Sequence, residues 1–136
     1  MREILFKAKR ICDGKWVEEY YLRDQYHIGG KDIIFYRKDS DRFTVYTDRI
    51  DIETLCQFTG LYDKNGKRIW ENDVVWIVCD GKEHIYQIVW DNSELDFKAT
   101  NGEENYGTNY EYLLCCDEIE VIGNIFDNPE LLQEEH

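Results

Sequence analysis

The fold is decided by the stretch Gln57-Phe58-Thr59-Gly60-Leu61-Tyr62-Asp63-Lys64-Asn65-Gly66-Lys67-Arg68-Ile69-Trp70-Glu71-Asn72-Asp73-Val74-Val75-Trp76-Ile77-Val78. Its Asn65-Gly66 pair lies between two apolar runs, the strongest short signal for a β-hairpin, because both residues tolerate the positive φ that primed turns require. We therefore predict a hairpin with its tip at 63–66. The run 74–78 lacks polar alternation, so both of its faces should be covered and it should form the centre of the core.

The same turn chemistry recurs on both sides of this stretch. Asp13-Gly14 predicts an opening hairpin between residues 4–11 and 15–22, and Asp80-Gly81 predicts another turn before a strand at 84–90. Further strands are expected at 33–36, 43–45, 95–99 and 119–125, with a short helical turn at 110–116. The sequence thus predicts an all-β barrel or sandwich of antiparallel hairpins, with at most short helical turns.

Three parts of the chain resemble the YopX family of phage and prophage proteins. They are the start Arg2-Glu3-Ile4-Leu5-Phe6-Lys7-Ala8, the central stretch 57–78, and the close Val121-Ile122-Gly123-Asn124-Ile125-Phe126-Asp127-Asn128-Pro129-Glu130-Leu131-Leu132. They match in order along the whole chain. Asn72 stands where that family usually has glycine, and Asn also tolerates the left-handed region. The resemblance implies a small, barrel-like, all-β protein encoded on mobile elements, without an established activity, and it carries over no catalytic or binding residues.

Length and composition favour one β-rich domain. The chain has 136 residues, of which 43% are hydrophobic and 15% aromatic, enough for a real core. We expect a single domain over 1–136, with an N-terminal hairpin subdomain over 1–53 and a barrel-like part over 54–132 as its internal division. No secretory signal or membrane-length apolar run is visible, so a cytoplasmic protein is expected.

The charge balance limits the partners. With 29 acidic and 16 basic residues, the net charge is -13, which repels nucleic-acid phosphates and anionic lipid surfaces. Direct nucleic-acid and membrane binding are disfavoured, and a basic host or phage protein is the expected partner. A homo-oligomer is also compatible with the sequence.

The five cysteines, Cys12, Cys56, Cys79, Cys115 and Cys116, have no CxxC spacing, which predicts reduced, mostly structural thiols. Neither histidines nor glycines form a recognisable catalytic or phosphate-binding motif. The acids Glu71 and Asp73 are a weak candidate for a carboxylate pair or cation site, and a solvated turn is the better interpretation. We therefore predict no enzyme activity, no cofactor and no metal.

Three hypotheses about function remain. The first is a non-enzymatic protein-binding module on an aromatic-lined barrel, the second an acidic decoy that imitates nucleic acid and occupies a basic DNA-binding or DNA-cutting host protein, and the third and weakest a small hydrolase. The residues predicted to bind a protein are the acids Asp48, Asp51 and Glu53 and the aromatics Trp70, Trp76 and Trp90. Glu103 and Glu104 are expected to add to the acidic surface.

Overall fold

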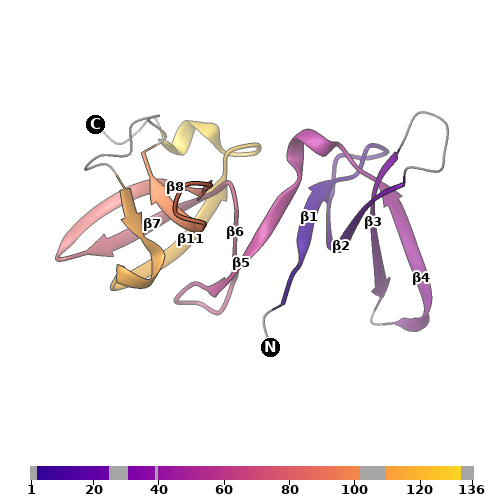
Figure 1. Ribbon diagram of the computed structural model, residues 1–136, viewed down its shortest axis with the longest axis horizontal. Coiled ribbons are helices and arrows are strands. Elements are labelled where there is room, and N and C mark those ends of the chain that lie inside the picture. The colour runs from indigo at the N-terminus through magenta and orange to yellow at the C-terminus, as the bar shows by residue number, and fades with distance from the viewer. Residues whose placement is uncertain (1–2, 25–30, 39, 102–109, 133–136) are drawn as a thin grey trace. The chain divides into compact units, whose positions relative to one another are not determined.

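The computed structural model describes residues 3–24, 31–38, 40–101 and 110–132, and most of the described backbone is antiparallel β-strand (Figure 1). The strands are β1 (Phe6–Lys9), β2 (Trp16–Asp24), β3 (Lys31–Lys38), β4 (Asp41–Arg49), β5 (Cys56–Tyr62), β6 (Arg68–Trp70), β7 (Asp73–Cys79), β8 (Lys82–Asp91), β9 (Asp96–Thr100), β10 (Tyr110–Tyr112) and β11 (Glu118–Asn124). Short 3-10 helices are η1 (Ile52–Thr54), η2 (Leu113–Cys115) and η3 (Pro129–Leu132). The predicted all-β class, with only short helical turns, is confirmed.

The chain divides into two compact units, Met1–Phe58 and Thr59–His136. The division falls inside β5, whereas the sequence predicted an internal boundary after residue 53. In the first unit, β4, β3, β2, β1 and the start of β5 are neighbours in that order. Gly14, at φ +71°, turns the chain between β1 and β2, as predicted. Ala8, Val17, Ile34 and Ile50 form the core cluster of this unit.

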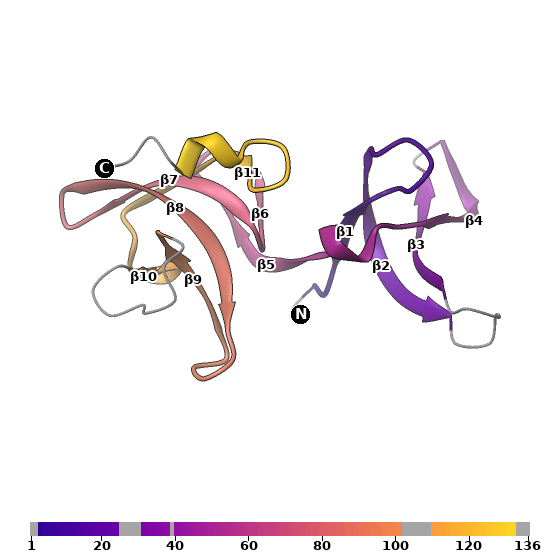
Figure 2. The same cartoon turned by 90° about the horizontal axis from the view of Figure 1, so that it is seen from above.

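The second unit is built on a five-stranded sheet with the order β10, β9, β8, β7, β11. Its core cluster contains Val75 and Ile77 from β7, Ile88 from β8 and Phe97 from β9. Ile69 of β6 is buried in the same cluster and Leu61 of β5 packs against it. The β5–β6 hairpin is therefore a second layer against the sheet. Figure 2 shows β8 and β9 running side by side as a hairpin, in agreement with their register.

The second unit is sandwich-like, which is one of the two arrangements that the sequence predicted, and it is not a closed barrel. In the described part of the chain, β10 and β11 end the five-stranded sheet at opposite edges, and each pairs with a single neighbour. The short β10 adds only three residue pairs to β9. A barrel needs its first and last strands to pair, and this sheet remains open.

The run 74–78 forms the centre of the core as predicted, although its two faces are not covered equally. Val74, Val75 and Ile77 are fully buried, whereas Trp76 and Val78 are half-buried. β7 lies between β8 and β11 in the sheet, so both of its edges are paired as well.

The central hairpin tip is at the predicted position, but its turn differs from the primed turn that Asn65-Gly66 indicates. Gly66 has φ +80°, whereas Asn65 does not have positive φ. The amide of Gly66 donates to the carbonyl of Asp63 at 3.0 Å, and the carboxylate of Asp63 accepts from the amides of Asn65 and Lys67, each at 2.9 Å. These side-chain bonds fix an ordinary turn followed by a left-handed glycine.

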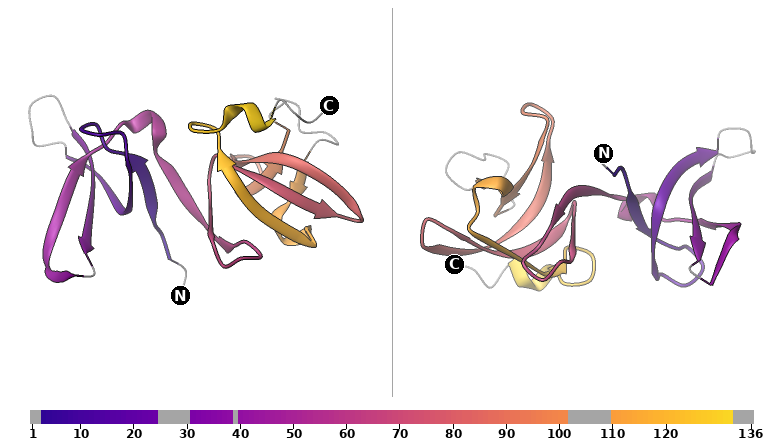
Figure 3. Two further views of the ribbon diagram at one scale, coloured as in Figure 1. Left: turned by 180° about the vertical axis from the view of Figure 1, so that it is seen from behind. Right: turned by 90° about the horizontal axis from the view of Figure 1, so that it is seen from below.

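Two other turns follow from local chemistry. Asn72 has φ +71°, which agrees with the expectation that asparagine can replace glycine at this site. Near the end of the chain, the register of β11 shifts between Val121 and Gly123, and Figure 3 shows how β11 continues into η3. A Cβ placed on Gly123 would lie 2.6 Å from Oδ1 of Asn128 and 2.9 Å from its Cβ.

In the described residues, no helix is long and apolar enough to cross a membrane.

Candidate functional site

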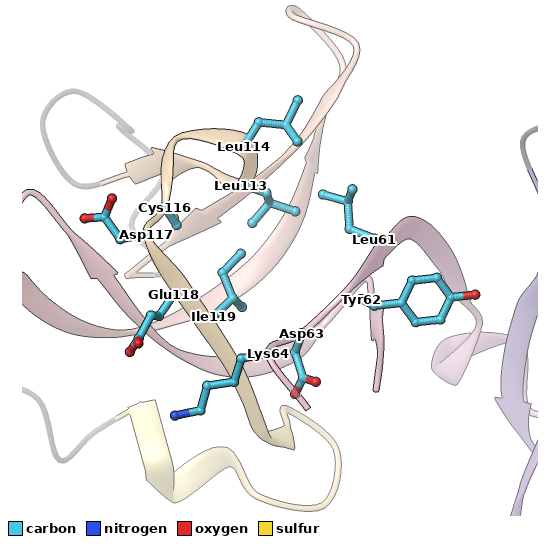
Figure 4. A pocket seen from close by; sticks show the side chains of 10 residues that line it. All are labelled: Leu61, Tyr62, Asp63, Lys64, Leu113, Leu114, Cys116, Asp117, Glu118 and Ile119. Carbon is cyan, nitrogen blue, oxygen red and sulfur yellow. The ribbon is translucent and has the colours of Figure 1, made fainter. Parts of the chain in front are cut away.

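The second unit carries a pocket of about 320 Å³ between β5, η2 and β11 (Figure 4). Leu61, Leu113 and Ile119 supply its apolar lining, and they come from those three elements. Leu113 is buried in the core and anchors η2 there. Alternation along β5 turns Leu61 toward the core and leaves the next residue, Tyr62, exposed.

Leu114 follows the buried Leu113 in η2, and 85% of its surface is exposed. It lines the first pocket and also a second one of about 380 Å³, which Leu61 and Leu113 share. The second pocket is completed by Thr59, Asp96, Phe97, Tyr112 and Cys115. An exposed leucine that lies between two hollows is an available apolar contact for another molecule.

The charges around the first pocket are mainly acidic. Asp117 and Glu118 line it and are exposed. Lys64 also lines it, but its Nζ lies 3.4 Å from Glu120 and 4.9 Å from the ring centroid of Trp76. The positive charge of Lys64 is therefore already partnered, and the two exposed carboxylates dominate the rim.

Asp63 lines the same pocket but serves the fold. It is buried, and its second carboxylate oxygen accepts from the amide of Val121 at 3.0 Å. Burial alone raises the pKa of Asp63, but the bonds from the backbone of Val121, Lys67 and Asn65 outweigh it, so the pKa lies below its ordinary value. A charged carboxylate thus joins the hairpin tip to β11.

A second polar cluster lies on β8, β9 and β10. Lys98 is 1% exposed, and its Nζ lies 2.8 Å from Asp91 and 2.7 Å from Glu94. The same Nζ lies 4.4 Å and 5.1 Å from the ring centroids of Tyr110 and Tyr112. Burial lowers the pKa of Lys98, but the two carboxylates outweigh it, so the pKa is raised. A protonated lysine held in this way is no nucleophile, so we assign the cluster a structural role.

The three acids predicted to bind a partner lie in the first unit and differ in availability. Asp48 accepts from the hydroxyl of Tyr36 at 2.8 Å and lies 3.4 Å from Arg10. Asp51 caps η1 by accepting from the amide of Glu53 at 3.1 Å, and the side chain of Glu53 is exposed. Glu103 and Glu104 lie outside the described residues. Their role in binding remains a prediction.

The three predicted tryptophans lie in the second unit and do not share one environment. Trp70 is buried, with 5% exposure, Trp76 is half-buried beside Lys64, and Trp90 is 37% exposed. Trp90 donates to the side chain of Asn92 at 2.6 Å and packs edge-on against Phe97. Of the three, Trp90 offers the most surface to a partner.

Glu71 and Asp73, the weak candidate for a carboxylate pair, differ in burial. Asp73 is 2% exposed and accepts from the amide of Trp70 at 2.8 Å, whereas Glu71 is half-buried. Across the residues that the structure describes, no group of three His, Cys, Asp or Glu side chains is placed to hold a metal ion.

The sequence did not predict η2 as a site. Its double leucine, Leu113-Leu114, lies in a segment for which a helical turn was predicted. Adjacent residues of a helical turn point to different sides, so one leucine in the core leaves the other exposed. The double leucine in a predicted helical turn could therefore have indicated an exposed leucine. Nothing in the sequence indicated that β5 and β11 would form the opposite wall of the pocket.

These features define a small, acidic, all-β protein with antiparallel sheets and an apolar pocket in its second unit. The family model described as YopX protein matches residues 5–133, so the chain belongs to the YopX family. The resemblance noted in the sequence is confirmed.

A solved structure supports the fold. The crystal structure of protein EF1440 from Enterococcus faecalis is similar over 97% of this chain and 99% of that chain, with a TM-score of 0.55 and 21% sequence identity. A likeness at that identity concerns the fold alone. The comparison with curated proteins gave no match.

Proposed function

We propose that the chain is a non-enzymatic protein-binding module, and that the pocket beside Leu114 takes an apolar side chain from a basic segment of its partner. The observation that carries the proposal is Leu114, which is 85% exposed between two hollows that share Leu61 and Leu113. Burying an exposed leucine contributes about 1.5 to 3 kcal/mol. A contact of that size at the centre of an interface exceeds what most interface residues contribute to binding.

Charge supports a basic partner. The chain has a net charge of -13, and two of its acidic residues, Asp117 and Glu118, lie exposed at the rim of the pocket. Carboxylates at a rim steer oppositely charged partners and set the association rate more than the final affinity. A segment with an apolar anchor flanked by lysine or arginine would satisfy both the pocket and its rim.

The acidic decoy is less well supported. A decoy needs carboxylates ranged along one face, whereas Asp48 and Asp51 each accept a hydrogen bond within the first unit. The apolar pocket has no place in that hypothesis.

The first test is comparative affinity capture from the native host with three baits: the parent chain, Leu114→Ser, and Leu95→Ser as the control. Leu95 is also an exposed leucine, 73% exposed, and it lines neither pocket. We expect one basic protein to be retained by the parent and by Leu95→Ser and depleted with Leu114→Ser. Kinetics by surface plasmon resonance should then show an affinity lower by roughly 10- to 150-fold for Leu114→Ser.

The rim is tested with the same captured protein. Asp117→Asn with Glu118→Gln should slow association and reduce its dependence on salt, whereas Asp51→Asn with Glu53→Gln tests the acids predicted from the sequence. Equal affinities for the parent and Leu114→Ser would refute the pocket. An association rate that changes neither with salt concentration nor with the rim substitutions would refute a basic partner.

A further inference from the structure

Two cysteine thiols of the second unit lie in contact at the end of β7. Cys79 ends β7 and Cys116 directly follows η2, and their Sγ atoms are 3.0 Å apart. That distance is about 1 Å longer than a disulfide bond of roughly 2.05 Å. A small side-chain movement would bring the two sulfur atoms to bonding distance.

Strand pairing holds the two thiols together across 37 positions of sequence. Glu118 lies opposite Val78 in the β7–β11 register, and the amide of Asp117 donates to the carbonyl of Val78 at 2.8 Å. Cys116 therefore arrives beside the end of β7 as a consequence of the sheet. The contact is part of the fold rather than a chance approach of two flexible side chains.

The two thiols differ in access. Cys79 is 5% exposed and belongs to the core cluster, whereas Cys116 is half-buried and lines the pocket of Figure 4. Burial raises the pKa of both thiols. A raised pKa keeps the thiolate fraction small near neutral pH. The pair therefore oxidises slowly at neutral pH and faster as the pH rises.

We propose that Cys79 and Cys116 are a redox modification site that a low-molecular-weight disulfide converts to an intramolecular disulfide. The thiolate of Cys116 attacks one sulfur of the small disulfide and expels the first small thiolate. The thiolate of Cys79 then attacks the sulfur of Cys116 and expels the second. Two protein thiols are oxidised, one small disulfide is reduced to two thiols, and the two protons pass from the protein thiols to the expelled thiolates.

The new bond would tie the end of β7 to the segment after η2 and close a loop that contains β8, β9 and β10. Closing a loop of this length restricts the unfolded chain, so the oxidised protein should unfold at a higher temperature than the reduced one. This inference goes beyond the proposed binding function and does not rest on it, because it is measured on the isolated protein.

The test is incubation of the reduced full chain with glutathione disulfide at a mildly alkaline pH, followed by mapping of an unreduced digest. We expect a cross-linked peptide that joins Cys79 to Cys116. Its mass should be lower by two hydrogen atoms than the summed masses of the two reduced peptides. Cys12 and Cys115 are exposed and serve as internal controls, because they should carry glutathione. A variant with Cys12→Ser and Cys115→Ser should still form the bond.

The thermal midpoint provides a second readout. It should rise by several degrees on oxidation of the Cys12→Ser, Cys115→Ser variant, and should not rise when Cys116→Ser is added. Three outcomes would overturn the proposal: glutathione on the exposed cysteines without a bond between positions 79 and 116, a bond from Cys79 to Cys115 instead, or an oxidised protein that melts below the reduced one.

Discussion

At the residue scale, Asp63 has the clearest energetic role. Its carboxylate accepts from the amides of Asn65, Lys67 and Val121, and the side chain is buried. Asp63→Asn keeps the shape, but it sets an NH₂ group against one of these amides. We expect the substitution to lower the free energy of unfolding by about 1 to 3 kcal/mol, the cost of an unsatisfied buried donor.

Urea unfolding would measure that loss. Asp117→Asn is the matched control, because Asp117 is exposed, and it should change stability by less than about 0.5 kcal/mol. Equal midpoints for the two variants would show that Asp63 does not join the hairpin tip to β11.

The residue scale also shows what sequence reasoning can and cannot reach. The left-handed conformation of Asn72 was predictable, because the family that the chain resembles usually has glycine there and asparagine tolerates positive φ. The type of turn at Asn65-Gly66 was not, because the carboxylate of Asp63 overrides the preference of the pair. The bond from Asp63 to Val121 spans 58 positions, and no local pattern announces a contact at that separation.

At the scale of elements, the cluster on β8, β9 and β10 predicts an acid-sensitive hairpin. Hydrogen bonds from Lys98 lower the pKa of both Asp91 and Glu94. In the unfolded chain these groups titrate near about 3.9 and 4.3. Their contribution to stability is therefore complete above that range and is lost as pH falls through the lower pKa values of the folded state.

The measurement is the urea midpoint of the parent, Glu94→Gln and Glu83→Gln at a pH of about 6 and about 3. Glutamine at position 94 takes up no proton, so the midpoint of Glu94→Gln should fall less on acidification than that of the parent. Glu83 is an exposed glutamate at the start of β8, and its variant should follow the parent. A fall of equal size in all three proteins would contradict the role of Glu94.

The existence of the elements was largely predictable and their order in space was not. Asp13-Gly14 and Asp80-Gly81 correctly predicted turns, because a glycine after a short polar residue adopts the positive φ of a turn without help from distant parts of the chain. That β11 lies beside β7, beyond three intervening strands, depends on long-range pairing. The pocket walls from β5 and β11 share this dependence, and so does the contact between Cys79 and Cys116.

At the scale of the whole molecule, two units with separate cores predict unequal local stability. The core cluster of the first unit rests on Ala8, Val17, Ile34 and Ile50, whereas that of the second includes larger side chains such as Tyr86 and Phe97. Less buried apolar surface gives weaker protection against local unfolding. Amides of β1 to β3 should therefore exchange hydrogen faster than those of β7 to β9.

Hydrogen exchange of the full chain, followed by mass spectrometry, measures this difference without dividing the protein. The comparison should use amides that are bonded inside a sheet in both units. Simultaneous exchange of all these strands, in one cooperative event, would show that the two units unfold together.

The close packing of Gly123 against Asn128 also constrains how this sequence can change over evolutionary time. The amide of Asn128 donates to the carbonyl of Asn124 at 2.8 Å, so Asn128 is held where a Cβ on residue 123 would need to go. A larger residue at 123 becomes acceptable only after Asn128 has been replaced or moved. That first step removes the hydrogen bond that the amide of Asn124 donates to Oδ1 of Asn128 at 3.4 Å. Divergent relatives that keep this turn and carry a larger residue at 123 should therefore also have exchanged Asn128, and an ancestor in which Gly123 alone was replaced would have carried a strained C-terminal turn.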